Sequence, residues 1–236
     1  DFIKKLKIDG LKINSSDLSN PLTLKLVSKC NLPINLSVGA STLNEIKKAL
    51  NILKDNKKVT LMYGQQNFPT KIDDINLESL KKLSSYFKRD TGYQDHCDGE
   101  SQEGYAVPAM SVALGSRVIE KHITLDRNKK GFDYESALLP QEFKNFVALI
   151  RSTEKAIGKN LPRPFSKSER SYRKFQKKSI VVLRDLKKNE ILKKDDVIFL
   201  RSDKLGIQPI NLKKIIGKKL KKNLKKYSTI EMKNFY

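Results

Sequence analysis

The hydrophobic and polar positions of this chain follow one repeating pattern from residue 8 to about residue 158. In each repeat, a short apolar run rich in β-formers ends in polar residues and is followed by an amphipathic stretch with helical spacing. The five runs are Gly10–Ile13, Leu32–Ser37, Val59–Tyr63, Gly92–Asp95 and Val118–Thr124. Their spacing of about 24 to 32 residues is the size of one βα unit, so the pattern predicts parallel strands joined by right-handed helical crossovers.

Residues that favour helix ends stand at the boundaries of the amphipathic stretches. Thr42 and Glu45 have the spacing of a capping box. Pro140 precedes a long predicted helix, Gln141–Ile157, and Gly158 is suited to close it. These signals support the α/β class.

The number of repeats leaves two architectures open. A closed (β/α) barrel has eight strands and typically about 250 residues, whereas the repeats here end within about 160 residues. The pattern fits an open doubly wound sheet, and it fits equally well a partial (β/α) barrel made of the last five βα units. Periodicity alone does not decide between them.

The composition changes after the last amphipathic stretch. Residues 161–174 are rich in proline and polar residues and are predicted to link a first domain, residues 1–160, to a second one, residues 175–236. The second domain is predicted to contain a strand at Ser179–Leu183, a turn and short strand at Leu186–Ile191, a short helix entering a strand at Asp195–Leu200, and a helix at Ile207–Ile216 closed by Gly217. A unit of this size buries little core, so we expect it to need a packing partner.

Composition and charge add few constraints. Of the 236 residues 38% are hydrophobic, and the net charge is +22. Most of the excess is lysine in isolated pairs, which is typical of solvated helix faces, and no zinc-finger, basic-zipper or RNA-binding aromatic signature accompanies it. We therefore expect no nucleic-acid partner. No apolar run approaches the roughly 18 residues of a membrane span, and Cys30 and Cys97 are too few for a disulfide framework, which favours the cytoplasm.

The chain contains only two histidines, His96 and His122. The first closes the fourth apolar run and the second lies within the fifth, one βα unit later. Catalytic groups of barrels gather at the carboxyl ends of neighbouring strands, which lie about 4.8 Å apart. The two imidazoles could therefore share one divalent ion, although two unrelated histidines would produce the same spacing.

Several segments closely resemble the sialic acid synthase family. They include Gly92–His96, Gly115–Arg127 with its "EKHIT-DR" stretch, and Lys130–Asp133, together with Leu11–Ile13, Leu36–Gly39 and Gln66–Thr70 in the same order and at similar intervals. In the second domain, Lys178–Val181, Asp195–Asp196 and Arg201 look like the antifreeze-like (SAF) domain of that family. The resemblance covers essentially the whole chain.

This resemblance implies an eight-stranded barrel that condenses phosphoenolpyruvate with an N-acetylated amino-sugar, such as N-acetylmannosamine, and releases phosphate. It implies that His96 and His122 bind a divalent metal, usually Mn or Mg, which acts as a Lewis acid on the open-chain sugar aldehyde. The cap domain of the family reaches the site of a second subunit, so the resemblance also implies a domain-swapped homodimer.

Four further positions match family groups that contact phosphoenolpyruvate. Lys12, which would also be a catalytic group, and the hydroxyls of Ser15 and Ser37 match positions that hold the phosphate and carboxylate. A lysine at a strand end is a suitable point charge for phosphate, and an exposed surface lysine is the alternative. Gln66 corresponds to a family asparagine, and its amide could serve the same contact.

Five positions match groups around the sugar. Asp17 stands where the family usually has glutamate, with a helix-capping carboxylate as the alternative, and Asp133 matches a sugar-binding aspartate. Phe68 stands where tyrosine is common, so one hydroxyl contact would be absent. Arg201 resembles the cap-domain arginine that reaches the N-acetyl group in the partner subunit, with a surface arginine as the alternative. Phe175 aligns with another sugar-facing cap position.

The departures from the family pattern lead to two expectations. Gly64 and Gln94 replace small hydroxyl residues at phosphoenolpyruvate-contacting positions, which favours an altered sugar of the legionaminic or pseudaminic kind. The first three family strands, with a further lysine and an acidic residue of the site, have no counterpart in this sequence. We therefore expect the 236-residue chain alone to be inactive.

Two other functions stay open from the sequence. The lysine-rich second domain could make the chain a non-enzymatic module that binds nucleic acid or an anionic surface. The repeats could also belong to a different phosphoenolpyruvate-using or metal-dependent barrel, such as a related sugar-acid aldolase.

Overall fold

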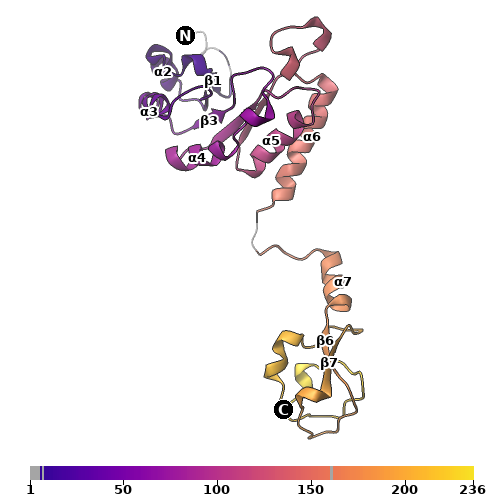
Figure 1. Ribbon diagram of the computed structural model, residues 1–236. Coiled ribbons are helices and arrows are strands. Elements are labelled where there is room, and N and C mark those ends of the chain that lie inside the picture. Colours follow the sequence, from indigo (N-terminus) through magenta and orange to yellow (C-terminus); the bar gives the residue numbers. More distant parts are fainter. Residues whose placement is uncertain (1–5, 7, 160–161) are drawn as a thin grey trace. The chain divides into compact units, whose positions relative to one another are not determined.

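The computed structural model comprises two compact units that divide after Lys159 (Figure 1). The structure describes residue 6, residues 8–159 and residues 162–236. Each unit contains its own hydrophobic core. Within these ranges, no helix has the length and apolar character that crossing a bilayer requires.

The first unit is a curled half-barrel of five parallel strands. They are β1 (Leu11–Ile13), β2 (Ile34–Ser37), β3 (Val59–Tyr63), β4 (Thr91–Asp95) and β5 (Val118–Lys121). Their order in the sheet is their order in the chain. A doubly wound sheet would reverse its strand order at a switch point, so the prediction of five βα units in a partial barrel is confirmed.

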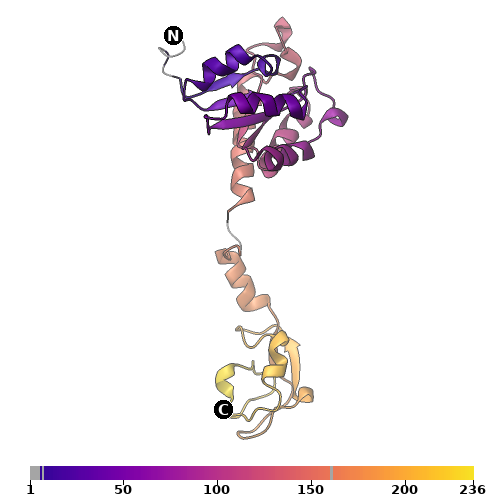
Figure 2. The same cartoon turned by 90° about the vertical axis from the view of Figure 1, so that its left-hand side faces the viewer.

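Helices cover the outer side of the curved sheet in both views (Figure 1, Figure 2). They are α2 (Pro21–Ser28), α3 (Leu43–Ile52), α4 (Glu78–Phe87), α5 (Glu103–Ala113) and α6 (Pro140–Ile157), with short 3-10 turns η1 (Ser15–Asp17), η2 (Ile72–Asp74), η3 (Arg127–Lys129) and η4 (Tyr134–Ser136) between them. Thr42 and Glu45 form the predicted capping box at the start of α3. Gly158 ends α6 with a positive φ of 67°.

The alternation of side chains along the strands separates the two faces of the sheet. In β1, β2 and β3, Ile13, Leu36 and Leu61 are buried in the core cluster that also contains residues of α2 and α3. The opposite, concave face receives the residues between them, such as Lys12 and its register partner Asn35. The alternation therefore places polar groups on the concave face, together with a few apolar residues such as Met62.

The second unit is built around a small antiparallel sheet. Its elements are α7 (Lys167–Gln176), β6 (Ser179–Val182), η5 (Lys194–Asp196), β7 (Val197–Leu200), η6 (Pro209–Lys214) and η7 (Met232–Asn234). Strand β6 pairs with β7, and isolated bridges tie in the rest of the chain, such as Leu220 with Phe235. The core of the unit gathers Ile180, Leu220 and Phe235 with seven further buried apolar residues.

The structure corrects three details of the predicted elements. The fifth strand ends at Lys121, so His122 lies just beyond the strand and not within it. The helix predicted at Ile207–Ile216 is the shorter 3-10 helix η6, which begins at Pro209, although Gly217 follows with the expected positive φ. Residues 161–174, predicted as a linker, contain most of α7.

Gly64 follows β3 at a point where this segment approaches β4 closely. A Cβ atom at Gly64 would lie 2.4 Å from the backbone oxygen of Gln94, so we expect Gly64→Ala to lower the free energy of unfolding by about 1 to 3 kcal/mol. Gly131→Ala is the matched control, because a Cβ there meets nothing within 4 Å. Urea denaturation followed by circular dichroism compares the two. If the two variants have the same free energy of unfolding, the segment at Gly64 and strand β4 can move apart without loss of stability.

Candidate functional site

The carboxyl ends of β3, β4 and β5 bring three aromatic rings together. His96 follows β4 directly, His122 follows β5 directly, and Phe68 lies in the segment after β3. The centroids of the two imidazoles are 5.3 Å apart. The Phe68 ring lies 4.3 Å from that of His96 and 5.9 Å from that of His122. The structure thus brings the only two histidines of the chain together against one shared phenyl ring.

The ring of His96 is held firmly in place. Its Nδ1 lies 2.5 Å from the carbonyl oxygen of Gln65. A carbonyl only accepts, so Nδ1 carries the proton and Nε2 keeps a free lone pair. The backbone oxygen of His96 accepts from the hydroxyl of Ser136 at 2.7 Å and from the amide of Thr70 at 2.8 Å. Burial lowers the pKa of His96 below its ordinary value, which favours the neutral ring.

His122 is more open and faces a carboxylate. Its side chain is 33% exposed, and its Nε2 lies 3.9 Å from Oδ2 of Asp133. The amide of Leu138 donates to the carbonyl oxygen of His122 at 2.9 Å. Asp133 itself adopts a left-handed backbone conformation in the segment between β5 and α6. This segment therefore presents a carboxylate beside the second imidazole.

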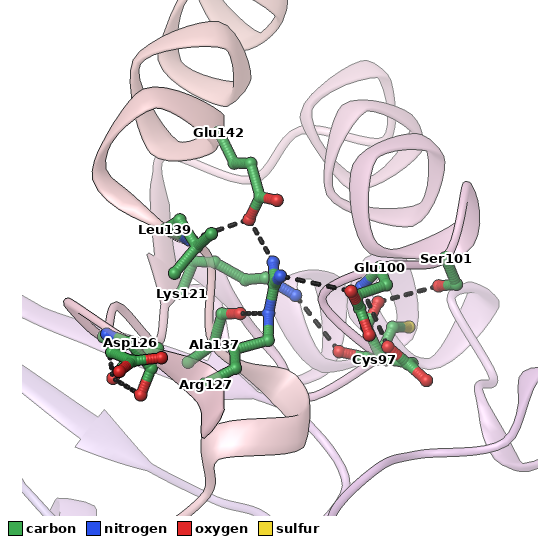
Figure 3. A network of polar contacts seen from close by, with 11 residues as sticks. Cys97, Glu100, Ser101, Lys121, Asp126, Arg127, Ala137, Leu139 and Glu142 are labelled. Carbon is green, nitrogen blue, oxygen red and sulfur yellow. Dashed lines mark hydrogen bonds and ion pairs between the residues drawn. The ribbon is translucent and has the colours of Figure 1, made fainter. Parts of the chain in front are cut away.

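Arg127 braces the segment that carries Asp133 (Figure 3). Its Nε donates to the carbonyl oxygen of Ala137 at 2.9 Å, and its guanidinium pairs with Glu142 in the first turn of α6 and with Glu100. Glu142 also accepts from the amide of Leu139 at 2.7 Å. The Arg127 side chain is only 14% exposed and Glu142 is 32% exposed, whereas Glu100 is 74% exposed. The contact with Glu142 is therefore the better shielded of the two ion pairs.

A chain of polar contacts crosses the concave face of the sheet. Lys12 on β1 pairs with Glu120 on β5 at 2.5 Å, and Glu120 also accepts from the side-chain amide of Gln94 on β4 at 2.9 Å. The hydroxyl of Ser37 on β2 donates to Gln94. Lys12 and Glu120 belong to the two edge strands, so the sheet is curved enough for its edges to face each other.

Glu120 was not predicted from the sequence to belong to the site, although its position along the strand indicates which face of the sheet it occupies. Glu120 is an acidic residue inside an apolar strand run, two positions before His122. Residues two apart on a strand share a face, so the placement of His122 on the concave face also places Glu120 there.

Two known protein-family patterns match this chain. The NeuB family pattern matches residues 1–161, which is more than half of the chain, and the SAF domain pattern matches residues 177–234. The chain belongs to the NeuB family.

Relatives of this chain include synthases of legionaminic, pseudaminic and N-acetylneuraminic acid, which are nonulosonic acids. The N,N'-diacetyllegionaminic acid synthase of Campylobacter jejuni is 35% identical over 95% of this chain and 66% of its own length. A pseudaminic acid synthase of the same species is 30% identical over 95% of this chain and 64% of its own length. The crystal structure of N-acetylneuraminic acid synthetase from Leptospira borgpetersenii is 31% identical, with a TM-score of 0.64, over 72% of this chain and 59% of that one. The chain thus spans between 59% and 66% of the length of these relatives.

Three other positions that resemble NeuB-family substrate contacts lie on loops. Ser15 and Asp17 form the turn η1 after β1, and Asp17 accepts from the side-chain amide of Asn20 at 2.9 Å. The cap of α2 is Asn20, so Asp17 contacts the capping side chain and does not cap the helix itself. Gln66 is exposed, and its side chain lies close to Gly39, because a Cβ atom added to Gly39 would be 2.5 Å from the Nε2 of Gln66. Among the described residues, no hydrogen bond joins these three side chains to either histidine.

The two cap-domain positions lie on the surface of the second unit. Phe175 belongs to α7 and is 46% exposed, with the Nζ of Lys174 4.9 Å from its ring centroid. Arg201 directly follows β7 and is exposed. Both side chains are accessible to a binding partner of this unit.

The histidine pair fits a divalent metal as two of its ligands. The residues that the structure describes contain no group of three or more His, Cys, Asp or Glu side chains placed to share one ion. Nevertheless, the contact of His96 Nδ1 with a backbone carbonyl is typical of a metal-binding histidine, because it fixes the tautomer and leaves Nε2 available. Water or substrate oxygen atoms would have to complete the coordination.

The burial of His96 leads to a testable difference between the two imidazoles. We expect His96 to titrate below the ordinary value of 6.5, because burial disfavours the imidazolium form. Proton NMR of the metal-free protein resolves two histidine C2 resonances, and a His122→Gln variant assigns them. Phe68→Ala uncovers the ring and should move the pKa of His96 upward. A wild-type pKa at or above 6.5 would contradict burial as the dominant influence.

Proposed function

We propose that this chain forms the later five βα units and the cap domain of a nonulosonic acid synthase. The enzyme would condense phosphoenolpyruvate with an N-acetylated amino-sugar and release phosphate. The observation that carries the proposal is the convergence of His96 and His122 beside Lys12, Glu120 and Gln94 on the concave face of a NeuB-family half-barrel. The activities of its relatives supply the reaction class.

Besides the two substrates, the reaction requires only water. The enol carbon of phosphoenolpyruvate attacks the aldehyde carbon of the open-chain sugar; the C–C bond forms as the carbonyl π bond opens, and the aldehyde oxygen takes up a proton. Water adds to the cation left on the former enol and gives up a proton. The resulting hemiketal phosphate loses phosphate by C–O cleavage and leaves a ketone. The two reactants must lie side by side for this step, and holding them in that geometry is the main contribution of the protein.

His96 and His122 would hold a divalent metal, Mn or Mg, through their imidazole nitrogens. When bound, the metal supplies Lewis-acid polarisation of the sugar aldehyde. His96 is neutral and oriented by the carbonyl oxygen of Gln65, so it needs no deprotonation before it binds a cation at neutral pH. Phe68 packs against both rings and excludes water from one side of the pair.

Lys12 would bind the phosphate or carboxylate of phosphoenolpyruvate. In the free protein Glu120 neutralises it across the concave face. The Lys12 side chain remains 39% exposed, so an incoming dianion can compete for the ammonium group. The hydroxyls of Ser15 and Ser37 and the amide of Gln66 would add hydrogen bonds to the same substrate.

Carboxylates and the cap domain would bind the sugar. Asp17 and Asp133 would accept hydrogen bonds from its hydroxyl groups. From the cap of a second subunit, Arg201 would contact the N-acetyl group and Phe175 another part of the sugar, which makes a domain-swapped homodimer the assembly we propose. Gly64 and Gln94, which stand at positions that resemble small hydroxyl residues of the family, would favour a sugar of the legionaminic or pseudaminic kind, in line with the relatives.

The metal proposal is tested by binding of Mn(II), followed by electron paramagnetic resonance. Loss of a group that only contacts a metal ligand weakens metal binding about 10- to 100-fold. We expect His96→Ala and His122→Ala, which each remove a ligand, to weaken Mn(II) binding by more than this. Tyr86→Ala removes an exposed ring on α4 and serves as the control. If both histidine variants bind Mn(II) as the wild type does, the proposed ligands are wrong.

The reaction is tested with two proteins, because five strands supply only part of a barrel. The 236-residue chain alone should not release phosphate from phosphoenolpyruvate, whatever sugar is present. The same chain fused behind the first three βα units of the Campylobacter jejuni legionaminic acid synthase should form a nonulosonic acid, detected by mass spectrometry. N-acetylmannosamine and a diacetamido sugar are compared as substrates.

Two results would contradict these expectations. Steady-state phosphate release by the 236-residue chain would show that five strands suffice, and would overturn the expected inactivity of the isolated chain. A fusion that is folded by circular dichroism and binds Mn(II), yet yields no product from either sugar, would contradict the assigned reaction.

A further inference from the structure

A buried ion pair lies behind the histidines, on the helix-facing side of the sheet. The Nζ of Lys121 lies 2.6 Å from Oδ2 of Asp95, and neither side chain is exposed to solvent. The same ammonium group donates to the carbonyl oxygen of Cys97 at 3.1 Å, a contact visible in Figure 3. Lys121 therefore ties the two residues that flank His96 in the chain.

The position of this pair follows from strand geometry. Asp95 and Lys121 are register partners at the ends of β4 and β5, and His96 and His122 are the next residues. Successive side chains point to opposite faces, so the ion pair faces the helices while the imidazoles face the concave side. Near the ion pair, a Cβ on Gly104 of α5 would lie 3.3 Å from the Nζ of Lys121, which shows how closely the helix covers it.

The buried thiol of Cys97 and phenol of Tyr93 beside the pair are held in their neutral forms. Burial is the main cause that raises the pKa of Cys97 to about 12, and the charge of Asp95 adds to it. The thiol is therefore protonated and a poor nucleophile. Burial also raises the pKa of Tyr93, again with a contribution from Asp95. The cluster is thus best understood through the geometry that it imposes on its neighbours.

Stability alone does not explain a buried pair of this kind. Removal of two charges from water costs several kcal/mol per ion, and well-packed apolar residues often stabilise a fold as well or better. Buried ionic groups are, in the best-attested cases, a means of specifying register. Here the register in question is that of β4 and β5, which sets where both imidazoles lie.

We propose that Asp95 and Lys121 are positioning residues that fix the separation and orientation of His96 and His122. The pair does so by pinning the carboxyl ends of β4 and β5 in register and by tying Lys121 to both chain neighbours of His96. The effect of the ion pair on divalent-ion affinity rests on the metal binding proposed above. The effect of the ion pair on the geometry of the two imidazoles does not depend on a metal.

The test compares Lys121→Met and the double variant Asp95→Asn/Lys121→Met with the wild-type chain. The single variant leaves a buried carboxylate without its partner, whereas the double variant removes both charges at nearly constant volume. Arg151→Met is the control, because it breaks an exposed ion pair with Glu154 on α6 of the same unit. Each protein is examined for fold by circular dichroism, for ring proximity by the nuclear Overhauser effect between the two imidazoles, and for Mn(II) affinity.

We expect the double variant to keep its fold, to lose or weaken the imidazole–imidazole Overhauser effect, and to bind Mn(II) about 10- to 100-fold more weakly, as for lost outer-shell partners. The control should change neither readout. A folded double variant with unchanged Overhauser effect and affinity overturns the positioning role. Failure of both variants to fold also overturns it, because the pair would then serve stability.

The readouts separate the two proposals. A wild-type chain that binds no Mn(II), but whose imidazole contact depends on the ion pair, would support the positioning role and contradict the metal site.

Discussion

The register between β4 and β5 is the constraint on which the candidate site depends. In-register pairing of Asp95 with Lys121 places the residue that follows each of them, His96 and His122, on the concave face. A shift of one strand by a single residue would turn one imidazole into the helix layer. The histidine pair therefore needs only two neighbouring strands, and the same alternation delivers Glu120 and Gln94 to the same face.

The charged groups near the histidines are paired, whereas the excess positive charge of the protein lies in the second unit. Lys12 is paired with Glu120 on the concave face, and Lys121 with Asp95 beneath it. The excess lies elsewhere, because residues 162–236 contain 23 lysines and arginines but only seven acidic residues. Their lysine pairs, such as those at 218–219 and 221–222, are exposed. The net charge of +22 is thus mainly a property of the surface of the second unit and says little about the chemistry of the half-barrel.

The sequence predicted those features that depend on local order along the chain. The five strands and the capping box of α3 follow from periodicity and short-range spacing. His96 closes an apolar run and falls at a strand end as predicted, whereas His122, predicted within its run, lies just beyond the end of β5. The contacts of Lys12 with Glu120, and of Arg127 with Glu142, join residues whose proximity depends on sheet curvature and loop path. Periodicity carries no information on either, so these partners emerge only from the three-dimensional structure.

The curvature of the sheet and the closure of a barrel are separate requirements for this site. Five strands already bend far enough for the side chains of the edge strands β1 and β5 to meet through Lys12 and Glu120. Both strands nevertheless keep one edge without a ladder partner among the described residues, and closure of the barrel needs three more strands between them. Histidines, lysine and glutamate are thus arranged by the half-barrel alone. The opposite wall would complete the contacts to the substrates and exclude water from the space between them.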